Sequence, residues 1–99
     1  MEGHAVISSD ILGRYAADAA AGVSGVSGLV PSQLHRHKGV RIVVDDGLRV
    51  ELHLAVEWGA SIPRVAREVQ ARVREYLGSM ANANVAAVEV IVDEVGPPA

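Results

Sequence analysis

Residues 40–57, VRIVVDDGLRVELHLAVE, decide the fold. Asp46-Gly47 in their middle is the dipeptide that type I′ turns prefer, because both central residues of such a turn need a positive φ. It predicts a β-hairpin with strands from Val40 to Val44 and from Leu48 to Glu57. Apolar residues at 48, 50, 52, 54 and 56 alternate with Arg49, Glu51, His53, Ala55 and Glu57. This period of two predicts a sheet with one dry face and one wetter face.

The dry face needs a helix over it, and the spacing of apolar residues from Ile62 to about Met80 predicts that this segment is the helix. Ser61 is its N-cap, and Pro63 falls in the first turn, where a missing N–H costs nothing. Its apolar residues form one stripe, while charged residues take the outer side at spacings that favour ion pairs. A valine-rich strand from Val85 to Val95 follows and joins the sheet parallel to a neighbour by a right-handed crossover.

A further helix is predicted upstream, from Ser8 to Val23, and three glycines at a period of three, Gly22, Gly25 and Gly28, end it. Residues 5–7 are extended in character and suit an extra edge strand. We therefore expect an α+β fold, a two-layer sandwich of order (β)-α-β-β-α-β whose mixed sheet carries both helices on one face. The chain is expected to form a single domain over residues 1–99, with loose tails at 1–4 and 96–99.

Composition narrows the class of protein. The 99 residues are 49% hydrophobic and 21% charged, which is a globular balance with room for one core. A net charge of -3 argues against a general polyanion binder. The absence of cysteine removes disulfides and thiolate chemistry, and suits a reducing cytosol. The N-terminus is not a basic signal region and no apolar run reaches membrane-spanning length, so we expect neither a secretory signal nor a membrane span.

Residue patterns for catalysis or metal binding are weak. No serine sits in a G-x-S-x-G elbow, and the paired acids fall in a turn and at a strand end. His35 and His37, joined by His4 or His53, could be imagined as a metal site. Without an acidic or thiol ligand at a paired spacing, they are interpreted as members of a polar loop and of the wetter sheet face. We predict no catalytic, cofactor-binding or metal residues, no small-molecule substrate and no enzyme activity.

Four residues are candidate partner contacts. Arg64, Arg67 and Arg74 share a side of the helix that begins at Ile62, where they form a narrow basic stripe for an acidic partner or anionic lipid. Interleaved glutamates dilute this stripe, so it also suits a salt-bridged solvent face. Trp58 follows a strand and precedes a glycine-containing loop, which suits either the edge of the core or an exposed contact surface. We place it at the core edge.

An alternative interpretation is a KH-like single-stranded RNA-binding module, because Gly25-Val26-Ser27-Gly28 matches the GxxG pattern that clamps a nucleotide backbone. The central residues are not basic, no helix begins at once after them, and the net charge is negative. These features disfavour a nucleic-acid partner and favour a helix cap followed by a turn.

The pattern as a whole resembles the alkaline shock protein family of bacterial envelope stress response proteins, from about Gly3 to Val95. The residues that carry the resemblance are Ile7-Ser8-Ser9-Asp10-Ile11-Leu12, Gly25-Val26, Val56-Glu57-Trp58-Gly59, Ile62-Pro63-Arg64-Val65-Ala66, Val69-Gln70 with Val73 in the same predicted helix, and Val85 to Val92.

This resemblance implies a non-enzymatic cytoplasmic protein that forms a homo-oligomer and is held near the inner face of the cell membrane by an integral-membrane anchoring protein. It implies a contribution to cell-envelope homeostasis under stress, and it carries no catalytic residues. Because a sheet in so small a chain keeps one face uncovered, we expect the sheet face and the strand edges to form the contacts.

Overall fold

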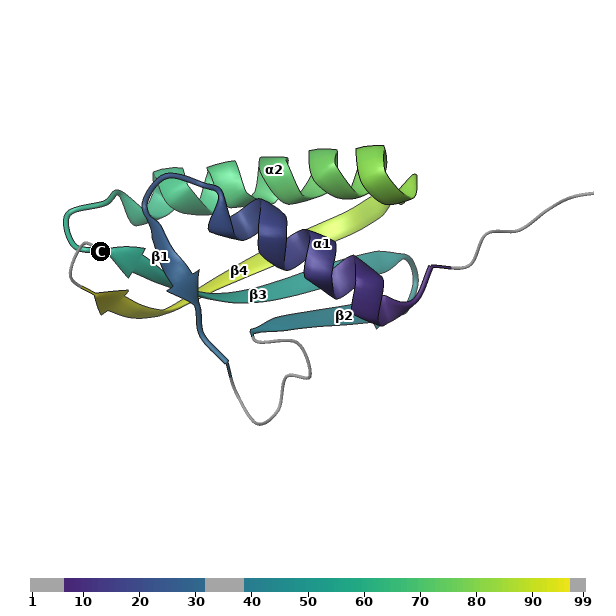
Figure 1. Cartoon of the computed structure of the whole chain (residues 1–99), viewed down its shortest axis with the longest axis horizontal. Coiled ribbons are helices and arrows are strands. Elements are labelled where there is room, and N and C mark those ends of the chain that lie inside the picture. Colours follow the sequence, from purple (N-terminus) through teal and green to yellow (C-terminus); the bar gives the residue numbers. More distant parts are fainter. Residues whose placement is uncertain (1–6, 32–38, 97–99) are drawn as a thin grey trace, which may run out of the picture.

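The computed structural model describes residues 7–31 and 39–96. Its elements are α1 (Ser9–Ala21), β1 (Val26–Leu29), β2 (Val40–Val44), β3 (Leu48–Glu57), α2 (Ile62–Ala81) and β4 (Val85–Gly96). Both helices lie on one face of the sheet, so the predicted α+β two-layer sandwich is confirmed (Figure 1). The order α-β-β-β-α-β contains one strand, β1, that the sequence did not predict. Ile7 is not in a strand, and residues 5 and 6 lie outside the described part of the chain.

Strand β3 is the centre of the sheet. Strand β4 pairs with it in parallel along one edge, from Leu48↔Val85 to Glu57↔Gly96. Its other edge is shared by two antiparallel strands, β2 next to residues 48–52 and β1 next to residues 54–56. The mixed sheet is therefore confirmed. So is the hairpin, whose turn residues Asp46 and Gly47 have φ values of 56° and 109°.

Strand β1 begins where the sequence predicted only the exit turn of a helix. Helix α1 ends at Ala21, two residues before the predicted end, and Gly25 turns the chain with a φ of 98°. The N–H of Glu57 then donates to the carbonyl of Gly25 at 2.8 Å, which fixes the start of β1 beside the end of β3. The short run from Val26 to Leu29 is a strand because β3 is long enough to supply it with a partner.

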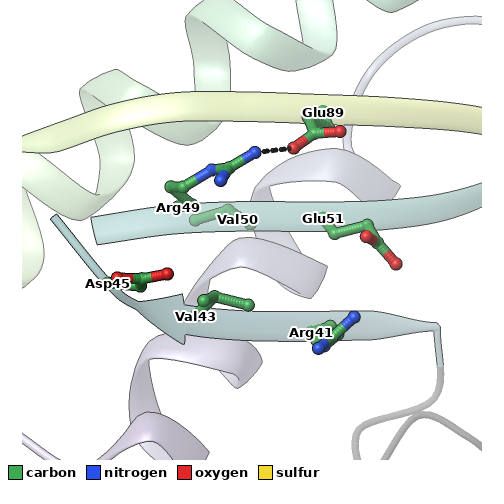
Figure 2. A pocket seen from close by; sticks show the side chains of 7 residues that line it. All are labelled: Arg41, Val43, Asp45, Arg49, Val50, Glu51 and Glu89. Carbon is green, nitrogen blue, oxygen red and sulfur yellow. Dashed lines mark hydrogen bonds and ion pairs between the residues drawn. The ribbon is translucent and has the colours of Figure 1, made fainter. Parts of the chain in front are cut away.

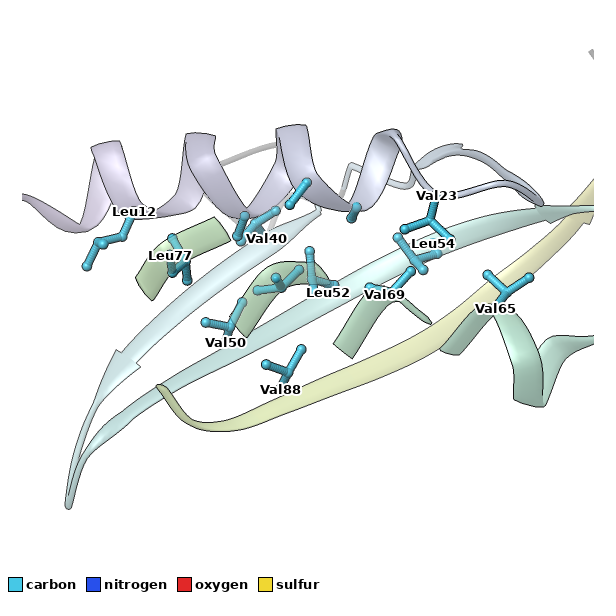
Figure 3. Packing of buried hydrophobic residues seen from close by; sticks show 14 of the residues in the cluster. Leu12, Val23, Val40, Val50, Leu52, Leu54, Val65, Val69, Leu77 and Val88 are labelled. Carbon is cyan, nitrogen blue, oxygen red and sulfur yellow. The ribbon is translucent and has the colours of Figure 1, made fainter. Parts of the chain in front are cut away.

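The core lies between the helices and the dry face of β3 (Figure 3). The side chains without solvent exposure come from the sheet, among them Leu52 and Leu54, and from the inner stripe of α2, with Val69, Val73 and Leu77. This burial supplies most of the driving force for folding, since it removes apolar surface from water. The alternation in β3 and the stripe on α2 therefore both have the structural role that the sequence predicted.

Polar and aromatic contacts fix the helices at their ends and at their crossing. The hydroxyls of Ser8 and Ser61 accept hydrogen bonds from backbone N–H groups in the first turns of α1 and α2, as N-cap residues do. The rings of Tyr15 and Tyr76 meet edge to face, with centroids 5.8 Å apart, between the two helices. At the other end of the chain, Gly96 belongs to β4 rather than to a loose tail.

The two glycines of the GxxG pattern make a matched test of the fold. A Cβ on Gly25 would lie 2.7 Å from Cγ2 of Val65, and an alanine at this position would also have to adopt a positive φ. Gly25→Ala should therefore lower the free energy of unfolding by about 1–3 kcal/mol. A Cβ on Gly28 meets no atom within 4 Å, so Gly28→Ala should change the free energy of unfolding by less than about 0.5 kcal/mol. Urea unfolding of both variants measures the difference, and equal effects would contradict this account of β1.

Candidate functional site on the open face of the sheet

The face of the sheet opposite the helices is covered by no helix or strand within the described residues (Figure 1). Alternation along β3 directs Arg49, Glu51 and His53 to this face, because their neighbours Val50 and Leu52 point into the core. The flanking strands extend the same surface, since β2 pairs Arg41 with Glu51 and β4 pairs Glu89 with Glu51. We call this surface the open face.

A histidine between two carboxylates occupies the open face. Nε2 of His53 lies 3.0 Å from Oε2 of Glu51, and Nδ1 lies 2.6 Å from Oδ2 of Asp93. Ionised carboxylates only accept, so both contacts are hydrogen bonds when both ring nitrogens carry a proton, which is the imidazolium form. Burial of the ring acts to lower the pKa of His53, but the hydrogen bonds and charges of the two carboxylates outweigh it and raise the pKa above 6.5.

A second ion pair crosses from β3 to β4 on the same face. The guanidinium of Arg49 donates to Oε1 of Glu89 at 2.6 Å, and both side chains are about half exposed (Figure 2). An exposed pair of this kind contributes about 0–1 kcal/mol, so it favours contact between the two side chains and adds little to stability. Together with the bond from His53 to Asp93, it pairs charges on the open face across β3 and β4.

A depression of about 260 Å³ lies in the part of the open face nearest the hairpin. Its lining residues are Arg41, Val43, Asp45, Arg49, Val50, Glu51 and Glu89 (Figure 2). Val43 is a half-buried apolar residue between charged neighbours. The side chain of Arg41 makes no hydrogen bond or ion pair with any residue in the described part of the chain. The depression therefore offers an apolar contact and a guanidinium that is available to a partner.

The described residues contain no group of three or more His, Asp or Glu side chains placed to hold a metal ion. Nor is any helix within residues 7–31 and 39–96 both long and apolar enough to cross a bilayer. The other candidate metal ligands, His4, His35 and His37, lie outside the described residues.

Trp58 is not at the core edge, so that prediction was wrong. Its side chain is 72% exposed. The backbone explains the difference: the N–H of Trp58 donates to the carbonyl of Gly96 at 2.7 Å, which continues the sheet by one bond, and Gly59 then turns the chain with a φ of 85°. Trp58 is therefore held beyond the end of the core and is available as a contact surface.

The three arginines of the predicted basic stripe have different surroundings. Arg64 pairs with Glu68 at 2.8 Å and donates to the carbonyl of Ser24 at 3.4 Å. Arg74 donates to the carbonyl of Ala86 at 3.4 Å, at the start of β4. Arg67 is exposed. Two of the three side chains thus help to hold the loop after α1 and strand β4 against α2.

The structure does not place the GxxG residues in a loop. Gly25 is the turn before β1, while Val26 and Gly28 belong to that strand and pair with Val56 and Ala55 of β3. A backbone clamp requires a free loop, so this geometry gives no support to the KH-like interpretation.

Sequence reasoning missed the contribution of β4 to the open face. The alternation in β3 predicts Arg49, Glu51 and His53 on the wetter side of the sheet, but it does not join Glu89 and Asp93 to them. Each of these acids is 40 positions away from the basic residue that it contacts. The parallel register of β3 and β4 brings them together. The spacing of four between Glu89 and Asp93 was the available signal, since it places both on one face of a strand.

Comparison with known proteins now decides the family. Residues 1–97 match the model of the alkaline shock protein 23 family, which is described as having a cell envelope-related function. The chain belongs to this family. The resemblance to the alkaline shock proteins that the sequence indicated is thereby confirmed.

Individual relatives are more distant. The chain is 30% identical over 59 residues to the uncharacterized protein YqhY of Bacillus subtilis (strain 168), a match that covers 59% of this chain and 44% of that protein. It therefore matches less than half the length of this curated relative. Among solved structures, a MamM-CTD variant has a TM-score of 0.58 and 17% identity, covering 90% of this chain and 99% of that one. A manganese form of the MamM CTD has a TM-score of 0.53 and 19% identity, with 85% and 95% covered. These likenesses show the fold alone.

The contacts of His53 predict a pH-dependent contribution to stability. A pKa raised in the folded state means that the contribution is complete below the ordinary value of 6.5 and is lost as the pH rises through the raised value. The difference in unfolding free energy between wild type and His53→Gln should therefore be larger at pH 5.5 than at pH 8.5, as measured by urea unfolding. Asp93→Asn should lower the pKa of His53 in an NMR titration, and a wild-type pKa at or below 6.5 would contradict the arrangement.

Proposed function

We propose that this chain is a non-enzymatic, self-associating protein of the envelope stress response. In this proposal it is cytoplasmic, is tethered to the inner face of the cell membrane by an integral-membrane partner, and contributes to cell-envelope homeostasis. The observation that carries the proposal is the open face. It presents paired charges on the sheet, and no described helix or strand covers it.

The character of the open face suits association between folded proteins. Its ion pairs are already formed within one copy, so the charged side chains lose little conformational freedom when a second surface meets them. Interfaces that form reversibly are about as polar as the rest of a protein surface, which matches a face built from Arg49, Glu51, His53 and Glu89. Membership of a family with a cell envelope-related function supports the place of this association in the cell.

A non-enzymatic role is supported by the way the charged groups are used. The carboxylates of Glu51 and Asp93 bind the same imidazole, and that of Glu89 binds Arg49. General acid–base catalysis requires groups that stay accessible to a substrate proton and whose pKa values are pushed apart. Here the three acids are already occupied by His53 and Arg49, which is a structural use of charge.

Self-association should depend on the open face and not on the outer face of α2. Arg49→Glu breaks the pair with Glu89 and reverses a charge on the open face, whereas Arg72→Glu makes the same change at an exposed site on α2. Light scattering over a dilution series should show a concentration-dependent mass for wild type and Arg72→Glu, and at least tenfold weaker association for Arg49→Glu. A wild type that stays monomeric at the highest concentration would contradict the proposal.

Tethering by a membrane protein predicts a particular fractionation result. Without a crosslinker, the chain should sediment with membranes from its own cells and be released by an alkaline carbonate wash. After crosslinking, it should stay in the pellet, joined to an integral-membrane protein. Protein recovered entirely in the soluble fraction, with no crosslink to a membrane protein, would contradict the tether and leave self-association to be judged by light scattering.

A further inference from the structure

Trp58 is the single tryptophan of the chain and lies 72% exposed beyond the end of β3. Exposing an indole to water forfeits the burial of a large apolar surface. Tryptophan is also strongly enriched among the residues that dominate binding energy at protein interfaces. Ile62 and Val95, which are 42% and 46% exposed, belong to the same end of the molecule, where α2 begins and β4 ends (Figure 1). This end of the fold therefore presents an apolar projection.

The depression on the open face lies toward the other end of β3. Arg49 on its rim and Trp58 are nine positions apart. At about 3.3 Å per residue in a strand, this separation is about 30 Å. Trp58 cannot reach the depression of its own copy, so any contact between the two features joins different molecules.

The chemistry of the depression suits an indole ring. Guanidinium groups bind the faces of aromatic rings, and tryptophan is the best of these partners. Arg41 and Arg49 both line the depression, and the side chain of Arg41 has no hydrogen bond or ion pair with another described residue. Val43 supplies apolar surface between them. The volume of about 260 Å³ is below the roughly 300–1,000 Å³ of small-molecule pockets, and suits one inserted side chain.

Charge gives the two features one point of attraction, at Arg41. Trp58 directly follows Glu57, and the exposed Glu94 stands two residues before Gly96, whose carbonyl accepts from the N–H of Trp58. The end that carries the indole is therefore acidic. Of the acids that line the depression, Glu89 is paired with Arg49 and Glu51 with His53, which leaves Asp45 and the guanidinium of Arg41 as its other charges. An approaching Trp58 brings Glu57 and Glu94 toward Arg41 and also toward Asp45, so charge gives the encounter no net preference, and the contacts of the ring with Arg41 and Val43 carry it.

We propose that Trp58 of one copy inserts into the depression of a second copy, where its ring packs against Val43 and stacks on the guanidinium of Arg41. This inference rests on the self-association proposed above and names the contact through which it occurs. The two surfaces are different parts of the chain, so the contact is heterologous, and each copy keeps one free Trp58 or one free depression for further neighbours.

Two complementary variants test the contact. Trp58→Ala removes the projection and keeps the depression, while Arg41→Glu spoils the depression and keeps the projection. Each variant alone should associate at least tenfold more weakly than wild type. Mixed in equal amounts they should form a pair that stops at two copies, because only one productive contact remains. Sedimentation measures the mass of the pair, and Ile62→Ala is the matched control for an exposed apolar residue at the same end.

The single tryptophan supplies a direct measurement on the same mixture, since only the Arg41→Glu copies then contain one. Adding Trp58→Ala copies should shift the tryptophan emission to shorter wavelength and reduce its quenching by iodide. Arg41→Lys, which keeps the positive charge, should associate more strongly than Arg41→Glu. Circular dichroism and urea unfolding establish that each variant is folded, and Arg41→Ala replaces Arg41→Glu if that variant is not.

The outcomes separate this contact from self-association in general. If wild type associates and both variants associate equally well, the contact is overturned while the proposed function stands. If each variant is monomeric but the mixture does not pair, a heterologous contact is overturned. If wild type itself is monomeric, the contact and the self-association both fail. Pairing of the mixture with a blue-shifted, protected tryptophan supports the contact, because a general loss of solubility or folding would not restore association.

Discussion

The pairing of β3 with every other strand of the described sheet is the constraint on which the rest depends. Because its side chains alternate, one strand supplies both the dry surface that α1 and α2 cover and the charged surface that stays open. A shift of one residue in its register would exchange the two surfaces. The hairpin turn at Asp46-Gly47 prevents that shift from the β2 side, and the ten paired positions with β4 prevent it from the other.

Local signals in the sequence were enough to predict most of the fold. Caps, turn dipeptides and periodicity predicted the hairpin, α2 and β4, since each of these is specified by residues close together in the chain. Strand β1 could not be found in this way, because its four residues contain a glycine and follow another glycine, and only the distant end of β3 makes them a strand. Trp58 was misplaced for a related reason: hydrophobicity indicates burial, but one backbone bond to Gly96 decides its position.

The sequence predicted the β3 side of the candidate site and missed the β4 side. Period-two alternation identified Arg49, Glu51 and His53 as outward-facing residues, but their partners Glu89 and Asp93 depend on the parallel register of β4, which no local pattern encodes. The likeness to the MamM CTD at 17% identity makes the same point about the fold, which depends on the pattern of apolar positions more than on particular residues. Function depends on the residues of the open face, and a shared fold does not specify those.

The outer edge of β4 is a less suitable place for association than the open face. Gln70 and Arg74 of α2 donate to the carbonyls of Val88 and Ala86, so the first half of this edge is already occupied by the protein's own side chains. The second half contains Asp93 and Glu94, and two copies that paired edge to edge would bring these acids together. Charge on an exposed strand is a known protection against unwanted sheet extension. The acidic end of β4 therefore disfavours pairing of edges, and the distribution of charge directs association away from this edge and leaves the open face as the better surface.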